Sequence, residues 1–220
     1  MKVLLIILSS QFVILVAGGQ TVGSFLPKAI KSNERYLFYQ HGAVVTELGN
    51  NAINQSVPEW GPYEYLNILD SLRSRGFNVI SERRVKQVPD SLYAHKIVLQ
   101  IDSLRSAGVG TKNIIVVGAS AGWNITLQVA SALENKKMKY VMMGGCWPDT
   151  YKEYEHDVLH GRFLSIIEKT DPHGTCFMIF KNRKVNRYQE ITLATGLSHG
   201  FIYKGYAEWI DPMMKWFKQN

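Results

Sequence analysis

The chain has 220 residues, of which 46% are hydrophobic and 20% are charged, and its formal net charge is +7. This length and composition are ordinary for one globular domain with a hydrophobic core, and they leave no room for a second domain. The basic charge is moderate and scattered, and nothing in the sequence resembles a nucleic-acid-binding module, so a nucleic acid is not an expected partner.

The first nineteen residues differ from the rest of the chain. Met1 and Lys2 place a positive charge ahead of an almost wholly apolar run over residues 3–16, and small residues follow at 17–19. This order is typical of a secretory signal peptide. A buried first strand or a membrane anchor is the alternative, although the run is shorter than the roughly 20 residues of a spanning helix. We expect the mature domain to cover residues 20–220, to be secreted or periplasmic, and to have no stable membrane insertion.

Short apolar runs alternate with segments of helical periodicity along the rest of the chain. Buried parallel strands are nearly continuous apolar runs, and such runs occupy residues 35–40, 77–81, 113–117, 140–144, 162–167 and 190–195. Helices are predicted from about residue 63 to the glycine at 76, and at residues 91–107, 123–133, 151–159 and 206–217. Residues 20–34 are weakly patterned, and residues 43–62 favour a long loop. This alternation predicts an α/β fold with a mostly parallel sheet of about six strands and helices on both faces.

The run at residues 113–117 leads into the motif G-A-S-A-G, which ends at Gly122 and is followed by the helix predicted at residues 123–133. Strand, tight turn and helix in this order indicate a nucleophile elbow, in which a strained turn exposes a serine hydroxyl at the sheet edge. Gly118 and Gly122 allow the strand and the helix to pass closely. We therefore predict that Ser120 is a nucleophile with a positive φ.

A serine hydroxyl needs a base that takes its proton and a third group that holds the base in one tautomer. Of the six histidines, His199 alone lies beyond the elbow between a strand end and a glycine, so we expect it to be the base. Asp171, which directly follows a predicted strand, is the preferred acid, with Asp149 and Asp157 as alternatives. The order Ser120, Asp171, His199 is the order of the catalytic triad in α/β-hydrolases.

The oxyanion of an acyl-transfer intermediate needs backbone N–H donors that are in place beforehand. Ala121 supplies one donor because it directly follows the nucleophile. The second should come from the loop after the first predicted strand, where Gly42 and Ala43 are the candidates. The preceding His41 either braces this loop or acts on the substrate.

The substrate pocket is only loosely defined by the sequence. Too few residues separate Gly145 from Arg162 for a large lid, so we expect an open mouth. The candidate pocket residues are His41, Trp60, Tyr63, Trp123 and Trp147. Core packing is the alternative for each of these side chains.

From residue 35 to the C-terminus the chain resembles a small, secreted, bacterial-type α/β-hydrolase without a cap domain. The resemblance rests on the H-G dipeptide at residues 41–42, G-A-S-A-G at the elbow, Asp171 after a later strand and S-H-G at residues 198–200. It implies a serine esterase, or a thioesterase or amidase, that works through an acyl-enzyme on a small-molecule or acyl-ester substrate, without a metal or cofactor. The glycine-rich H-G-G-G form of the oxyanion loop is missing.

Two further functions stay open at this point. One is a binding protein of the same fold whose triad is inactive, and the other is an acyltransferase that uses the same acyl-enzyme. The fold alone does not separate them.

The two cysteines follow predicted strands that would be neighbours in the sheet. Cys146 and Cys176 would then lie at the same edge, where a disulfide with its usual Cα separation of roughly 4.4–6.8 Å is feasible, and export would supply an oxidising compartment. Two separate buried thiols are the alternative. Because the spacing has no C-x-x-C pattern, a zinc site is not expected.

Overall fold

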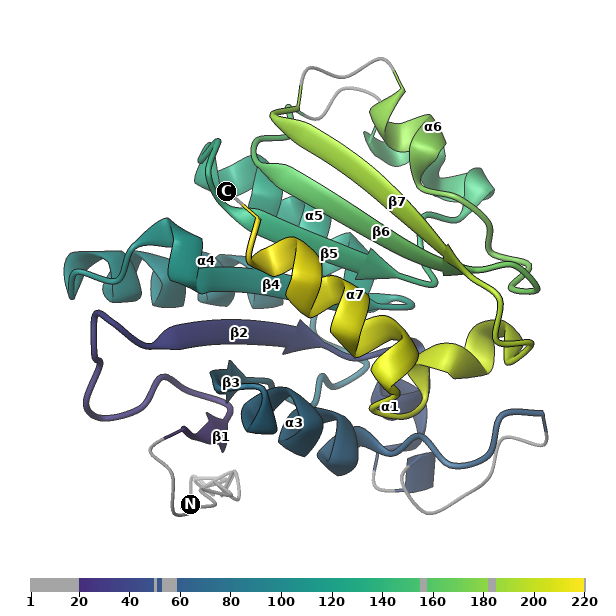
Figure 1. Ribbon diagram of the computed structural model, residues 1–220, viewed down its shortest axis with the longest axis horizontal. Helices are drawn as coiled ribbons and strands as arrows, with labels where there is room; N and C mark the ends of the chain where they lie inside the picture. The colour runs from purple at the N-terminus through teal and green to yellow at the C-terminus, as the bar shows by residue number, and fades with distance from the viewer. Residues whose placement is uncertain (1–19, 50, 53–58, 155–157, 182–184, 220) are drawn as a thin grey trace, which may run out of the picture.

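The computed structural model describes residues 20–49, 51–52, 59–154, 158–181 and 185–219. Over these residues, seven strands form one sheet in the order β1-β3-β2-β4-β5-β6-β7, in which every pair is parallel (Figure 1). The α/β class and the mostly parallel sheet predicted from the sequence are confirmed. The expected signal peptide at residues 1–19 lies outside the described residues. No helix in the described part is long and apolar enough to cross a membrane.

The elements alternate along the chain as expected. The strands are β1 (Val22–Gly23), β2 (Arg35–Gln40), β3 (Phe77–Ile80), β4 (Ile114–Ala119), β5 (Lys139–Met143), β6 (Arg162–Glu168) and β7 (Arg187–Leu193). The α-helices are α1 (Ala43–Leu48), α3 (Tyr65–Ser74), α4 (Asp90–Ser106), α5 (Gly122–Leu133), α6 (Phe177–Phe180) and α7 (Ala207–Phe217). The 3-10 helices are η1 (Thr111–Asn113), η2 (Pro148–Tyr154) and η3 (Ser198–Ile202).

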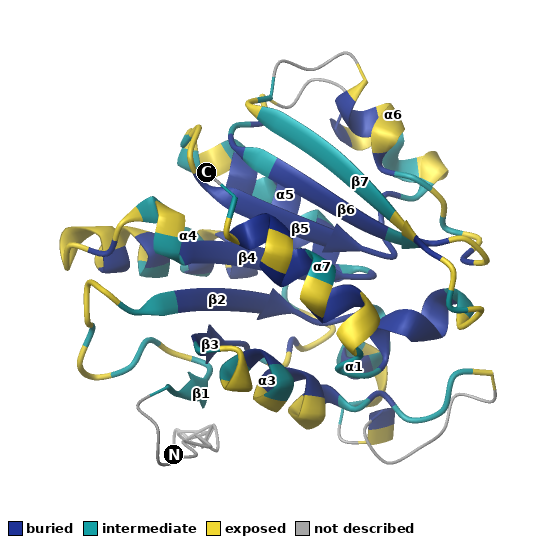
Figure 2. Ribbon diagram, in the orientation of Figure 1, coloured by how far each residue is buried: buried dark blue, intermediate teal, exposed yellow. Residues whose placement is uncertain are grey.

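The sheet separates two hydrophobic cores. In β2, Leu37 and Tyr39 belong to the core shared with α3 and α7, whereas Tyr36 and Phe38 belong to the core shared with α4 and α5. The central strands are buried along their length, and the covering helices expose their outer sides (Figure 2). Because both faces are covered, both sets of alternating side chains are apolar, which explains the continuous apolar runs in the sequence.

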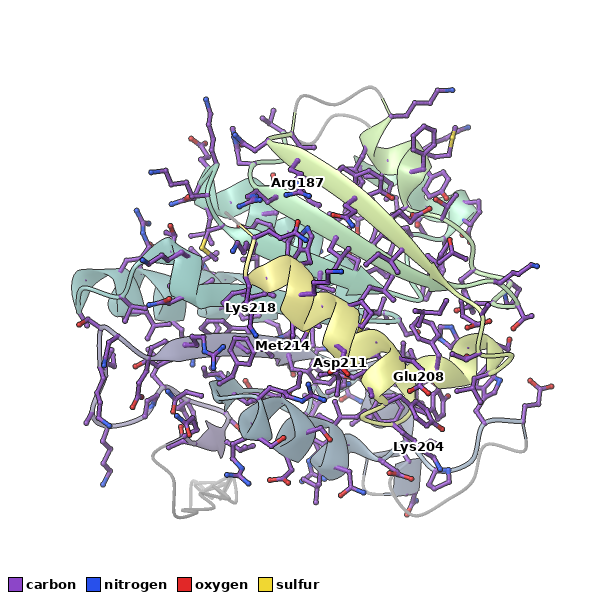
Figure 3. The ribbon with its side chains drawn as sticks, in the orientation of Figure 1. Arg187, Lys204, Glu208, Asp211, Met214 and Lys218 are labelled. Atoms are coloured by element: carbon purple, nitrogen blue, oxygen red, sulfur yellow. A yellow bond between two sulfur atoms is a disulfide. The ribbon has the colours of Figure 1, made fainter. Side chains whose placement is uncertain are left out.

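Helix α7 crosses the sheet on the same face as α3. Its buried stripe consists of Trp209, Ile210, Met213, Met214, Trp216 and Phe217. Ion pairs at the surface join it and the segment before it to the neighbourhood of α3: Asp211 binds Arg75, and Lys204 Nζ lies 3.1 Å from Glu64 Oε1. Asp211 and Lys204 are labelled in Figure 3. Exposed pairs contribute little to stability, so burial of the apolar stripe holds α7 in place.

Some boundaries differ from the prediction. Residues 43–48, expected within a long loop, form α1, because packing of Val45 into the core overrides the low helix propensity of its β-branched residues. The helix expected at residues 151–159 is the 3-10 helix η2, which starts at Pro148 and ends at Tyr154. The two-residue β1 and the four-residue α6 were missed because they are too short to show a period.

Two glycines allow α5 to lie against the sheet. A Cβ atom on Gly118 would lie 2.3 Å from the Gly122 carbonyl oxygen, and one on Gly122 would lie 2.2 Å from the carbonyl oxygen of Gln40 in β2. Both separations are far below van der Waals contact with backbone atoms, which cannot swing aside. The predicted close passage of strand and helix is confirmed.

Gly122→Ala is therefore expected to destabilise the protein by about 1–3 kcal/mol, because the added methyl group overpacks the elbow. Gly110→Ala is the matched control, since the nearest atom to its added Cβ would be Lys112 Cγ at 3.8 Å. Thermal unfolding followed by circular dichroism should show a clear fall in Tm for Gly122→Ala and little change for Gly110→Ala. Equal Tm values would contradict the close approach.

Candidate active site

Ser120 lies in the turn between β4 and α5 and has a φ of 48°. Its backbone N–H donates to the Met143 carbonyl oxygen at the end of β5 (2.8 Å), and its carbonyl oxygen accepts the N–H of Trp123 (2.9 Å). A positive φ is unfavourable for a residue with a side chain, so these contacts and the packing of α5 stabilise a strained turn. The positive φ predicted for Ser120 is confirmed.

His199 lies on η3, directly after the loop that follows β7. Its Nε2 atom is 3.0 Å from Ser120 Oγ, and its Nδ1 atom is 2.8 Å from Asp171 Oδ2. An ionised carboxylate only accepts hydrogen bonds, so Nδ1 carries the proton and Nε2 is free to accept the proton of the serine hydroxyl. The predicted hydrogen-bond contacts of His199 are both present, and all three residues are buried.

Asp171 follows β6, and its backbone N–H donates to the Glu168 carbonyl oxygen (2.9 Å). Burial acts to raise the pKa of its carboxyl group, but hydrogen bonds from His199 and His173 outweigh that effect and hold the pKa below its ordinary value. Asp171 is therefore ionised at neutral pH. The alternative Asp149 is exposed at the start of η2, and Asp157 lies outside the described residues.

Glu168, at the end of β6, anchors the loop that carries His199. Its carboxylate accepts hydrogen bonds from Thr195 N (2.9 Å), Thr195 Oγ (2.8 Å) and Gly196 N (3.3 Å). Burial acts to raise its pKa, yet these bonds lower it below the ordinary value of 4.5. Sequence reasoning missed this residue, and the only signal was an acidic residue at the end of an apolar strand.

The loop after β2, which is the candidate oxyanion loop, lies against Ser120. A Cβ atom on Gly42 would lie 3.2 Å from Ser120 Cβ and 3.7 Å from its Oγ. The Gly42 N–H already donates to Tyr63 Oη (3.4 Å), whereas Ala43 begins α1, where the first N–H groups have no acceptor within the helix. Of the two candidates, Ala43 is better placed than Gly42 to act as a second donor together with Ala121.

His41 is fully buried, with 0% of its surface exposed among the described residues, so the pocket role considered for it is corrected. Its Nδ1 donates to the Gly42 carbonyl oxygen (2.8 Å), and its Nε2 accepts the backbone N–H of Arg84 (3.0 Å). Burial, reinforced by the charge of Arg84, lowers its pKa to about 3, so the ring is neutral. His41 braces the loop after β2, which was the first of the two roles considered for it.

The tryptophans divide into core and site residues. Trp123 is 1% exposed and packs in the core, which corrects its assignment to the pocket, and Tyr63 is also fully buried. Trp60 and Trp147 are only partly buried: the Trp60 ring lies 5.3 Å from that of His199, and the Trp147 ring 5.6 Å from that of His173. These two indoles flank the pair of histidines.

His173 is a second residue that sequence reasoning missed, although its two-residue spacing from Asp171 was a signal. Within the described residues, Asp171, His173 and His199 are the group whose potential metal-ligand atoms lie within 4.8 Å of one another. The Nδ1 atoms of both histidines lie at hydrogen-bond distance from the Asp171 carboxylate. The three side chains thus form one hydrogen-bonded network.

The two cysteines form a disulfide, with a Cα–Cα distance of 5.0 Å. The sequence left this choice open, and the structure decides for the bridge. Cys146 follows β5 and lies next to Trp147, whereas Cys176 directly precedes α6. The disulfide therefore connects the loop of Trp147 to the loop that runs from Asp171.

The same arrangement of strands and helices is found in solved structures of hydrolases. A candidate dienelactone hydrolase from Klebsiella pneumoniae is similar with a TM-score of 0.57 and 13% identity, over 88% of this chain and 90% of that one. The chain has the α/β-hydrolase fold. DcsB in complex with a substrate analogue gives a TM-score of 0.53 and 12% identity over 87% of this chain and 92% of that one. A lipase-esterase related protein from Clostridium acetobutylicum gives a TM-score of 0.50 and 13% identity over 86% of this chain and 97% of that one.

These structural similarities establish the fold of the chain. Sequence identities of 12–13% carry no information about its substrate. No protein-family model matches the sequence, and no curated protein matches it either. In the α/β-hydrolase fold, the catalytic serine lies at the elbow where this chain has Ser120. The functional argument therefore rests on the geometry of the site itself.

Replacing both cysteines, Cys146→Ala with Cys176→Ala, is expected to lower the free energy of unfolding by about 2–4 kcal/mol, because the bridge closes a loop with a sequence separation of 30. Denaturant unfolding of the variant and wild type measures the loss. Alkylation of the unfolded wild type without reductant, followed by mass measurement, should find no free thiol. Two alkylated cysteines would refute the bridge.

Glu168→Gln should lower stability by about 1.5–3 kcal/mol at pH 7, because the amide replaces an ionised acceptor of several N–H and O–H donors. The folded-state pKa of Glu168 lies below 4.5, so its contribution is complete above that pH and is lost as pH falls through the folded-state pKa. Denaturant unfolding across pH 3–7 should show the gap to wild type closing at the acid end. The exposed Glu208→Gln is the control, and an equally small loss in both variants would contradict this role.

Proposed function

We propose that the protein is a serine hydrolase that cleaves an ester, or a thioester or amide, through an acyl-enzyme. The observation that carries the proposal is the pair of hydrogen bonds that joins Ser120 Oγ to His199 Nε2 (3.0 Å) and His199 Nδ1 to Asp171 Oδ2 (2.8 Å). A strained turn presents the nucleophile, a base lies within reach of its proton, and an ionised acid fixes the tautomer of the base.

In the acylation step, Ser120 Oγ attacks the carbonyl carbon of the substrate while His199 Nε2 accepts the hydroxyl proton. The Ala121 and Ala43 N–H groups would donate to the oxyanion of the tetrahedral intermediate. When the intermediate collapses, the bond to the leaving alcohol breaks and His199 gives its proton to that oxygen. Asp171 stays ionised throughout and stabilises the imidazolium ion that forms on His199.

Deacylation repeats these steps with water as the nucleophile. Water attacks the acyl carbon, and His199 accepts one of its protons. The second tetrahedral intermediate then expels Ser120 Oγ, which recovers its proton from His199. The products are a carboxylic acid and the free enzyme, so the cycle needs no metal or cofactor.

The surroundings of the site support a small-molecule or acyl-ester substrate. The partly buried Trp60 and Trp147 lie beside the two histidines, where their rings can contact apolar groups next to the scissile bond. Secretion remains part of the proposal, because the pattern of residues 1–19 is typical of a signal peptide and the disulfide suits an oxidising compartment.

A panel of chromogenic esters of increasing acyl length tests the proposal. Wild type should hydrolyse at least one member, Ser120→Ala should abolish turnover, and His199→Ala should nearly abolish it, because the triad acts as a unit. Asp171→Asn should lower kcat by about 10⁴-fold through loss of the correct His199 tautomer. Circular dichroism should show that each variant is folded at the assay temperature, although Asp171→Asn loses an ionised acceptor of three hydrogen bonds and should have a lower Tm.

The controls distinguish the competing functions. Turnover that persists in Ser120→Ala would refute the nucleophile, and an Asp171→Asn variant with full activity would remove Asp171 from the mechanism. A wild type inert to every ester would favour the inactive binding protein. Added alcohols that divert the acyl group into new esters, with little free acid, would indicate an acyltransferase.

A further inference from the structure

The Asp171 carboxylate serves two histidines, one on each oxygen. Oδ2 lies 2.8 Å from His199 Nδ1, and Oδ1 lies 2.7 Å from His173 Nδ1 and 3.0 Å from the His173 backbone N. Because the ionised carboxylate has no proton to donate, His173 must carry its proton on Nδ1. Rotation of the carboxylate would break all three hydrogen bonds at once.

We propose that His173 is a positioning residue that fixes the Asp171 carboxylate in the orientation that His199 needs, an inference that rests on the proposed hydrolase function. The backbone bond from residue 173 forms an Asx-turn, which places the ring two residues beyond Asp171. Pro172 between them restricts φ and limits the conformations of the turn. The side-chain bond then completes the hold on Oδ1.

The His173 ring is itself held in place. It lies 4.3 Å from the His199 ring, centroid to centroid, and 5.6 Å from the Trp147 ring on another loop. The disulfide joins Cys146, the neighbour of Trp147, to Cys176, which lies three residues beyond His173. The Asx-turn, the ring contacts with His199 and Trp147, and the disulfide together fix the orientation of the His173 ring and of its Nδ1 proton.

His173 differs from the triad in its contact with solvent. Its side chain is 32% exposed, whereas those of Asp171 and His199 are 3% and 6% exposed. No step of the acyl-enzyme cycle needs a proton from it. The geometry therefore assigns it an effect on turnover through Asp171, with little effect on the binding of substrate.

The matched pair His173→Asn and His173→Leu tests the inference. The two side chains have nearly the same shape, but only asparagine keeps an N–H donor near the position of Nδ1. His173→Leu should lower kcat about tenfold or more with KM nearly unchanged, because a hydrogen bond to a charged group is lost. His173→Asn should restore most of the kcat. His95→Leu, at an exposed position on α4, controls for the loss of a histidine.

The outcomes separate this inference from the proposed function. Wild-type kcat in His173→Leu, or equal losses in His173→Leu and His173→Asn, would overturn the positioning role while leaving the hydrolase proposal intact. A wild type that hydrolyses no ester, thioester or amide would refute both. If His173→Leu does not fold, ¹⁵N NMR of histidine-labelled wild type decides: the inference requires the His173 proton on Nδ1, and a proton on Nε2 alone would overturn it.

Discussion

The close contact between α5 and the sheet at Gly118 and Gly122 is the constraint on which the site depends. With the backbone of α5 resting on the carbonyl oxygen of Gln40, the chain must turn from β4 into the helix within two residues. That turn forces Ser120 to a φ of 48° and directs its hydroxyl beyond the strand end. The strain is local, and it is balanced by burial of the strand and the helix on both sides of the turn.

The parallel sheet then brings the other functional residues to the same edge. The candidate oxyanion loop follows β2, Ser120 follows β4, Asp171 follows β6 and His199 comes after β7. Polar contacts between loops fix the fine geometry. Glu168 binds the backbone of the loop before His199, and the disulfide links the loop of Trp147 to the segment after Asp171. The parallel sheet brings the functional residues near one another, and these contacts between loops fix their final separations.

Much of this was predictable from the sequence, for a physical reason. Ser120 and Asp171 follow strands that are continuous apolar runs, β4 and β6, whereas His199 follows the mixed strand β7; parallel strands bring all three positions to one edge. Glu168 and His173 were not predicted. Glu168 binds backbone N–H groups of a loop, and His173 reaches Asp171 through a turn, so both contacts depend on loop conformations that no periodic pattern reveals. Whether His41 and Trp123 lie in the core or line the pocket could also be decided only from the structure, because an aromatic ring suits both places.

Whether the strained serine is an activated nucleophile is the central claim, and covalent trapping measures it most directly. Wild-type protein would be incubated with a serine-reactive phosphonate, digested, and mapped by mass spectrometry, with Ser120→Ala as control. The account predicts a single stoichiometric adduct on the peptide that contains Ser120, and it predicts that labelling is much slower in His199→Ala. An unlabelled wild type, or an adduct on another residue that persists in Ser120→Ala, would contradict it.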